Sequence, residues 1–160
     1  ALNERVPEAL ALVAQQQPLV IRHQTGKKQV ELTAQRYQQL GLNAEVQPFI
    51  SDMAEAYGWA DVVICRSGAL TVSELAAAGV ASVLIPYPHA VDDHQTANGR
   101  YLSDAGAAIL CPQAQMSAET LAETLKPLLS RPKLLQMATI ARKLAQPQAT
   151  ATVAQFCLRC

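Results

Sequence analysis

The sequence predicts one α/β domain built as a doubly wound parallel sheet. Short apolar runs of strand length alternate with segments of helical periodicity along most of the chain, as in parallel sheets joined by right-handed helical crossovers. One run, "DVVIC" at residues 61–65, has no polar residue between its first and last positions, as expected of a parallel strand covered on both faces. The chain has 160 residues, half of them apolar, which suits one sizeable core and one domain.

The first half of the chain is predicted to alternate helix and strand. Leu2, Val6, Ala9 and Val13 recur at helical spacing, and Pro18 then opens the strand-like run "PLVIR". In order, we expect a helix over 2–13, a strand over 18–22, a helix over about 28–40 that breaks at Gly41, a strand over 44–49 and a helix over about 52–57.

The second half repeats this alternation. Gly79 follows a helical segment and is a natural C-terminal cap, and Pro132 is expected to start a new helix. In order, we expect strands over 61–65, 82–88 and 107–111, helices over 71–78 and about 93–104, and helices through most of 117–144.

The start of the chain is unusual for this fold class. A doubly wound sheet normally opens on a strand, whereas this sequence opens inside a helix, "ALNERVPEAL", with no glycine turn ahead of it. We therefore expect the first strand and its ligand loop to be missing, so that the chain is a fragment of a longer protein.

Charge and hydropathy exclude several classes of partner. Thirteen basic residues balance thirteen acidic ones, so the chain has neither a nucleic-acid-binding stripe nor a polybasic membrane arm. No apolar run approaches the roughly 20 residues that cross a bilayer, and the N-terminus lacks a cleavable signal pattern. The sequence predicts a soluble, intracellular domain.

The cysteines indicate no metal or redox site. Cys65 and Cys111 end apolar runs, where a free thiol usually packs as a small hydrophobe. Cys157 and Cys160 form a CxxC pair, but no second pair or histidine cluster accompanies them. We expect no metal and no cofactor.

The loop after residues 61–65 has the strand, glycine turn and helix of a phosphate-binding corner. It lacks the lysine of a P-loop and the GxGxxG of a dinucleotide fold, so an anion would be held by the helix N-terminus, where Thr71 adds a hydroxyl donor. Glu74, about one turn in, can accept hydrogen bonds from a vicinal diol such as ribose. Alternatively, Thr71 and Glu74 are merely favourable first-turn residues.

Two further loops follow predicted strands and can carry ligand contacts. The backbone near Ile50, in "PFISDM", could bind the edge of a base, although Ser51 and Asp52 are more simply explained as helix caps. Capping would also account for Asp92 or Asp93, but not for the whole polar run that opens the helix near residue 93. The groups suited to sugar hydroxyls there are Asp93, His94, Gln95 and Asn98.

Four motifs together resemble a known family. "DVVICRSGALTVSELAAAG", "IPYPHAVDDHQTANGRYL", "HQTGK" at residues 23–27 and "PFISDM" at residues 48–53 are similar to the C-terminal half of the MurG family. That family is the N-acetylglucosaminyltransferase that converts lipid I to lipid II in bacterial peptidoglycan synthesis, and it has the two-domain GT-B architecture. The resemblance covers nearly the whole chain and implies a Rossmann-like UDP-sugar-binding domain over residues 1–160.

The resemblance also implies roles for individual residues. The backbone of Ile50 would pair with uracil, Thr71 would bind the diphosphate, and Glu74 would bind the ribose hydroxyls. His94 and Gln95 would face the N-acetylglucosamine. The remaining implied contacts are Ala69, Leu70, Val72 and Ser73 around the nucleotide, with Arg66 and Asn3 lining the cleft.

The resemblance places other functions outside this chain. In the family, the N-terminal domain carries the lipid I acceptor site, the proposed general base and the membrane-facing patch, so the catalytic residues are unknown here and the chain alone is predicted inactive. The whole enzyme would lie peripherally on the cytoplasmic face of the bacterial inner membrane, and the transfer would be inverting and metal-independent. Two alternatives remain open: a separately encoded donor-binding subunit completed by a partner chain, and a UDP-sugar epimerase of the same architecture.

Overall fold

The structure is a computed structural model that describes residues 1–89 and 93–159, and each hydrogen-bonded pair of strands in these segments is parallel. They form a pair, β1 (Ile21–Gln24) with β2 (Ala44–Gln47), and a three-stranded sheet in the order β3 (Val62–Cys65), β4 (Ala81–Leu84) and β5 (Ala108–Leu110). The predicted parallel α/β class is confirmed. The described strands nevertheless make two sheets instead of one, because β1 and β3 are not hydrogen-bonded to each other.

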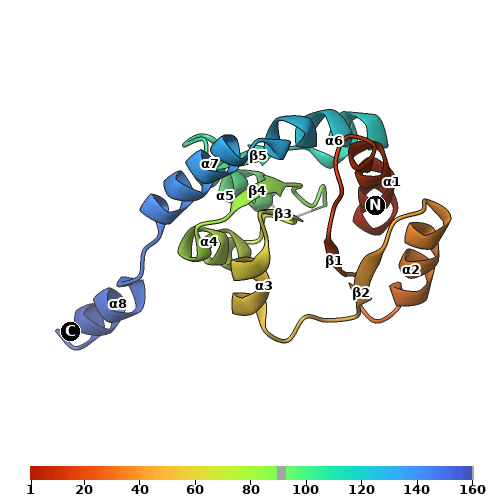
Figure 1. Cartoon of the computed structure of the whole chain (residues 1–160). Helices are drawn as coiled ribbons and strands as arrows, with labels where there is room; N and C mark the ends of the chain where they lie inside the picture. The colour runs from red at the N-terminus through yellow and green to blue at the C-terminus, as the bar shows by residue number, and fades with distance from the viewer. Residues whose placement is uncertain (90–92, 160) are drawn as a thin grey trace.

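Helices precede, connect and follow these strands (Figure 1). The α-helices are α1 (Leu2–Ala14), α2 (Val30–Gln39), α3 (Met53–Trp59), α4 (Ala69–Ala78), α5 (His94–Ser103), α6 (Ala118–Leu125), α7 (Arg131–Leu144) and α8 (Ala149–Cys157). Short 3-10 helices span Gln113–Gln115 and Lys126–Leu129.

The predicted elements are present, with shifts at several ends. The strand predicted from Pro18 begins only at Ile21. Helix α4 begins two residues earlier than predicted, directly after Gly68, whose extended backbone (φ −63°, ψ 148°) makes it the N-cap. Gly79 caps α4 in the left-handed conformation, and Pro132 lies in the first turn of α7, so both of these predictions are confirmed. The 3-10 helix after β5 and helix α8 were not predicted.

Burial differs between β3 and its neighbour β4. The sequence predicts a strand covered on both faces at residues 61–65, yet all four residues of β3 are only partly buried. The strand that is buried at every position is β4, which has a partner on each side. The prediction of two covered faces is nevertheless confirmed, because Val62 and Ile64 pack against one apolar cluster and Val63 and Cys65 pack against another. The remaining exposure of β3 reflects its position in the sheet, since among the described strands it has a hydrogen-bonded neighbour on one side only.

Two apolar clusters pack on opposite faces of the three-stranded sheet. Ala81 and Val83 of β4 point into a cluster shared with α1, α6 and α7, whereas Leu84 points into one shared with α3, α4, α5 and α7. This alternation follows from the pleat of a β-strand. Helices therefore cover both faces of the sheet, as in a doubly wound fold.

Helix α8 lies apart from the other helices at the C-terminal end of the described chain (Figure 1). All of its residues are exposed, including the large apolar side chains Val153 and Phe156. Cys157 is exposed, whereas Cys160 lies outside the described residues. No helix of the described part of the chain is long and apolar enough to span a bilayer.

Candidate functional site

A cleft of about 580 Å³ separates β1 from β3. Its walls are mainly apolar and come from β1, β3, α1 and α3. Figure 1 shows the β1–β2 pair set beside the other sheet. In open parallel sheets, ligands bind beyond the carboxyl ends of the strands, so this end of the cleft is the place to look for a site.

Five of the predicted site residues line this one cleft: Asn3, Ile50, Arg66, Thr71 and Glu74. They come from α1, from the loop before α3, and from the β3–α4 corner. Three segments far apart in sequence are thus brought together.

The N-terminus of α4 lies at this corner. Gly68 supplies no side-chain cap, so the first-turn N–H groups have no intrahelical acceptor and carry the positive end of the helix dipole. The side chain of Leu70 is 73% exposed, whereas that of Val72 is 4% exposed and belongs to the core. Ala69 and Ser73 are also exposed, and the Ser73 hydroxyl donates to the Ala69 carbonyl at 3.0 Å.

Glu74 is half-buried and receives a hydrogen bond from another helix. The Tyr57 hydroxyl of α3 donates to Glu74 Oε2 at 3.0 Å. Burial first, and then this hydrogen bond to the carboxylate, raises the pKa of Tyr57, so its hydroxyl stays protonated as a donor. Tyr57 was not predicted as a site residue, because nothing in the sequence places residue 57 beside residue 74.

The backbone N–H of Ile50 already has a partner. It donates to Gln24 Oε1 at 2.8 Å, so a base that pairs with this N–H must displace the Gln24 side chain. Gln24 lies in the "HQTGK" motif but was assigned no role from sequence.

Asn3 belongs to a half-buried polar network at the same end of the cleft. Its amide Nδ2 donates to the Thr25 carbonyl at 3.1 Å, and its Oδ1 lies 3.1 Å from His23 Nε2. His23 Nδ1 lies 2.8 Å from the Tyr37 hydroxyl. These partners assign the proton to Nε2, since Oδ1 can only accept. Burial lowers the pKa of His23, which favours this neutral ring.

Arg66 is tied to the ends of neighbouring segments. Its Nη1 donates to the carbonyls of Ile85 and Pro86 at 3.1 and 2.9 Å, and its Nη2 donates to Gln113 Oε1 at 2.6 Å. The guanidinium also lies 5.4 Å from the centre of the Tyr87 ring, and burial lowers the pKa of Arg66. Arg66 therefore uses several of its N–H donors to hold the loops that follow β4 and β5.

The N-terminus of α5 is docked against the β3–α4 corner. The buried Ser67 hydroxyl donates to the Gln95 carbonyl at 2.7 Å, while Gln95 Oε1 accepts the Tyr87 N–H at 2.9 Å. Asn98 reaches the Ser67 carbonyl at 3.4 Å. His94 is exposed in the first turn of α5. His94 and Gln95 are not among the residues that line the cleft, and Asp92 lies outside the described residues.

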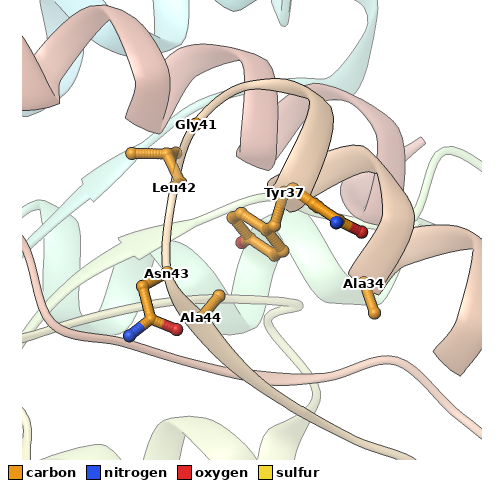
Figure 2. Close-up of a pocket in the computed structure, with 7 residues that line it drawn as sticks. Ala34, Tyr37, Gly41, Leu42, Asn43 and Ala44 are labelled. Carbon is orange, nitrogen blue, oxygen red and sulfur yellow. The ribbon is translucent and has the colours of Figure 1, made fainter.

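A second hollow, of about 410 Å³, lies between α2 and residues 42–44 (Figure 2). Figure 2 shows the Tyr37 ring between the helix and this segment, and no charged side chain lines the hollow. It contains none of the predicted site residues.

The described cysteines are free, and burial raises the pKa of the Cys65 and Cys111 thiols. Burial, and secondarily the nearby Glu74 carboxylate, raises the pKa of Cys65 to about 12, so its thiol remains protonated near neutral pH. No group of three histidine, cysteine or acidic side chains within residues 1–89 and 93–159 is arranged to hold a metal ion.

Comparisons with known proteins agree on one family. The model of the glycosyltransferase family 28 C-terminal domain matches residues 1–153. Two proteins named UDP-N-acetylglucosamine--N-acetylmuramyl-(pentapeptide) pyrophosphoryl-undecaprenol N-acetylglucosamine transferase, from Marinobacter nauticus and Pseudomonas putida strain W619, are each 56% identical to the chain. The matches cover 98% of the chain and 43% and 44% of those proteins.

Solved structures show the same relationship. The crystal structure of Acinetobacter baumannii MurG matches 99% of the chain with a TM-score of 0.93 and 49% identity, over 46% of its own length. The glycotransferase of kitacinnamycin, at 22% identity and a TM-score of 0.65, shares the fold. The chain thus spans less than half the length of these relatives.

Proposed function

The chain belongs to the family of the glycosyltransferase family 28 C-terminal domain, and on that premise we propose that it binds UDP-N-acetylglucosamine as the donor half of the transferase that converts lipid I to lipid II. The resemblance to MurG drawn from the four sequence motifs is confirmed. The observation that carries the proposal is that Ile50, Thr71 and Glu74 line one cleft.

Each part of the donor has a proposed partner of matching chemistry. The Ile50 backbone pairs with uracil after Gln24 moves aside, and Glu74 accepts hydrogen bonds from the ribose hydroxyls. The free first-turn amides of α4, from Ala69 to Thr71, and the Thr71 hydroxyl bind the diphosphate, whereas the Val72 amide already donates to the Gly68 carbonyl. His94 and Gln95 at the start of α5 bind the sugar. Arg66 and Asn3 shape the rim of the cleft, since both are held by protein groups.

The proposed chemistry needs only protein groups on the donor side. As the bond between the sugar and the diphosphate breaks, negative charge grows on the leaving group, and the N-terminus of α4 stabilises that charge. We assign the lipid I site, the catalytic base and the contact with the inner membrane to the remaining part of the enzyme, as in the MurG family.

We also propose that the cleft between β1 and β3 holds one more strand, which precedes α1. The order β2-β1, then the new strand, then β3-β4-β5 would make one continuous sheet of the type whose ligand site lies where the strand order reverses. Two observations support it: β1 and β3 line the same cleft without being hydrogen-bonded to each other, and Asn3 at the start of α1 bonds to Thr25 directly after β1. A strand in the cleft would therefore end close to Ala1.

The two alternatives are less well supported. The relatives carry transferase names and are more than twice as long as the region they share with this chain, which favours a domain of one enzyme over a separately encoded subunit. A UDP-sugar epimerase would release UDP or a changed sugar from UDP-N-acetylglucosamine without any lipid acceptor, so product analysis separates it from a transferase.

Calorimetry and a transfer assay test the proposal. We expect UDP-N-acetylglucosamine and UDP to bind and ADP not to bind, because the Ile50 backbone contact selects the base. With a lipid I analogue, the 160-residue chain should transfer no sugar, since the acceptor site and base are assigned elsewhere. Equal binding of ADP would refute the donor site. Robust turnover by this chain alone would refute the assignment of the acceptor site and the catalytic base to the rest of the enzyme.

A further inference from the structure

We infer that Tyr57 is a positioning residue whose hydroxyl holds the Glu74 carboxylate in the orientation that accepts a vicinal diol. The inference rests on the proposed function, because it assumes that Glu74 binds the ribose. It adds a residue on a different helix to the donor site and assigns it a role that depends on Glu74.

The Tyr57 ring is fixed by packing. Its side chain is 8% exposed and belongs to the cluster that includes Val72, Leu75 and Ala76 of α4. This packing restricts the ring, and its hydroxyl lies 3.0 Å from Glu74 Oε2. A buried phenol needs a hydrogen-bond partner, and here the partner is the carboxylate itself instead of a backbone carbonyl.

Glu74 is otherwise free of strong restraints. Across the described residues no ion pair involves it, and the only hydrogen bond recorded there for its carboxylate is the one from Tyr57. A glutamate side chain has three rotatable bonds, and ordering it on ligand binding has an entropic cost. The Tyr57 hydroxyl reduces that cost because the carboxylate is already oriented in the free protein.

The contact with Tyr57 also leaves acceptor positions of the Glu74 carboxylate available to a ligand. Tyr57 occupies one acceptor position on Oε2, which leaves Oε1 and the second lone pair of Oε2 for two donors. The two hydroxyls of a vicinal diol are such a pair of donors. Tyr57 should therefore increase affinity for ligands with an intact ribose and have little effect on ligands that lack the diol.

Helix α3 also connects this contact to the base. Ile50 lies just before α3, and the Asp52 side chain caps the helix by accepting the Glu55 N–H at 2.8 Å. The same short helix thus carries Tyr57 at one end and follows the proposed uracil contact at the other. Helix α3 therefore sets the distance between the proposed ribose contact and the proposed base contact.

Tyr57→Phe tests the inference, because it removes the hydroxyl and keeps the packed ring. We expect UDP affinity, measured by calorimetry, to fall about threefold to tenfold, and the affinity for 2′,3′-dideoxy-UDP to stay the same. In a Glu74→Ala background, Tyr57→Phe should have no further effect on UDP. Tyr101→Phe is the matched control, since its hydroxyl bonds to the Leu144 carbonyl at the C-terminus of α7, and it should leave both affinities unchanged.

The outcomes separate this inference from the proposed function. If the wild-type protein binds UDP no better than dideoxy-UDP, the diol contact and the inference fail together. If the wild type discriminates and Tyr57→Phe discriminates equally well, the proposed site stands and the role of Tyr57 is refuted. Equal losses for both ligands, or an undiminished effect in the Glu74→Ala background, would show that Tyr57 acts through general packing.

Discussion

Several polar side chains around the cleft are already bonded to the protein itself. Gln24, Gln95 and Arg66 each hold a backbone group of another segment. Residue types in the sequence predicted anion, diol and sugar chemistry at these loops, but the partners of each side chain depend on tertiary contacts. For this reason the contacts of Gln24 and Tyr57 could not be predicted, whereas the ligand roles of Thr71 and Glu74 follow from residue type and stay predictions.

Glu74→Gln distinguishes ligand binding from helix capping. Because α4 begins at Ala69, Glu74 lies beyond the first turn, where the sequence had placed it, so a role limited to the helix dipole would contribute little to stability and nothing to nucleotide binding. If Glu74 accepts from both ribose hydroxyls, the amide spoils one of the two contacts, and UDP affinity should fall by roughly 1.5–3 kcal/mol, or about ten- to a hundredfold. Calorimetry with 2′,3′-dideoxy-UDP is the control. Equal losses for both ligands would refute the diol contact of Glu74.

The His23 network predicts a pH dependence of stability. Because burial lowers the pKa of His23 below its ordinary value of 6.5, the unfolded chain binds a proton more readily than the folded one. The contribution of neutral His23 to the free energy of unfolding is complete above pH 6.5. It decreases as the pH falls through 6.5 towards the lower folded-state pKa, by at most about 1.4 kcal/mol per pH unit. Urea unfolding from pH 7.5 to 5.5 measures it, and His23→Gln should flatten the profile. A variant as steep as the wild type would contradict this account.

Helix boundaries were predictable where a single residue determines the backbone. Gly79 was predicted as a cap because glycine readily adopts positive φ, and it does so at φ +68°. The start of β1 was not predictable, because Leu19 and Val20 are as apolar as Ile21, and the strand begins at Ile21 where its pairing with Ala44 of β2 begins. The burial of β3 and the existence of α8 depend on what lies beside them, and local sequence does not contain that information.

Gly79→Ala should destabilise the domain by roughly 1–2 kcal/mol, the penalty for a side chain in the left-handed region. The new Cβ would also lie 3.1 Å from Arg142 Cβ and 3.4 Å from the Ala138 carbonyl oxygen. Gly58→Ala in α3 is the matched control, because nothing lies within 4 Å of its Cβ position and alanine favours a helix interior by about 1 kcal/mol. Thermal or urea unfolding should show a lower free energy of unfolding for Gly79→Ala and a higher one for Gly58→Ala. A stabilising Gly79→Ala would contradict the role of Gly79 as the cap.

At the scale of the whole molecule, the fold class followed from the alternation of strands and helices, but the division into two sheets did not. The cleft between β1 and β3 has apolar walls and two strand edges that are not paired across it. Such edges accept an added strand readily. The fold is therefore expected to be completed from outside residues 1–160.

An N-terminal extension tests this expectation. A run of about five valine and isoleucine residues, joined to Ala1 by a short Gly-Ser loop, should raise the unfolding temperature by pairing with both edges. Trp59, the sole tryptophan of the sequence, lines the cleft and is 41% exposed, so its emission should shift to the blue. The same run with prolines at alternate positions cannot pair and is the control. Identical behaviour of the two extensions would refute the added strand.

The central claim is that the donor binds at the end of the cleft where α4 begins. Backbone amide NMR during a titration with UDP-N-acetylglucosamine tests it most directly, since it locates the ligand without any mutation. We predict that the largest shifts fall on Gln24 and Ile50, on the first turns of α4 including Thr71 and Glu74, and on Gln95. Shifts confined to the hollow beside α2 in Figure 2, or none at saturating ligand, would contradict the account.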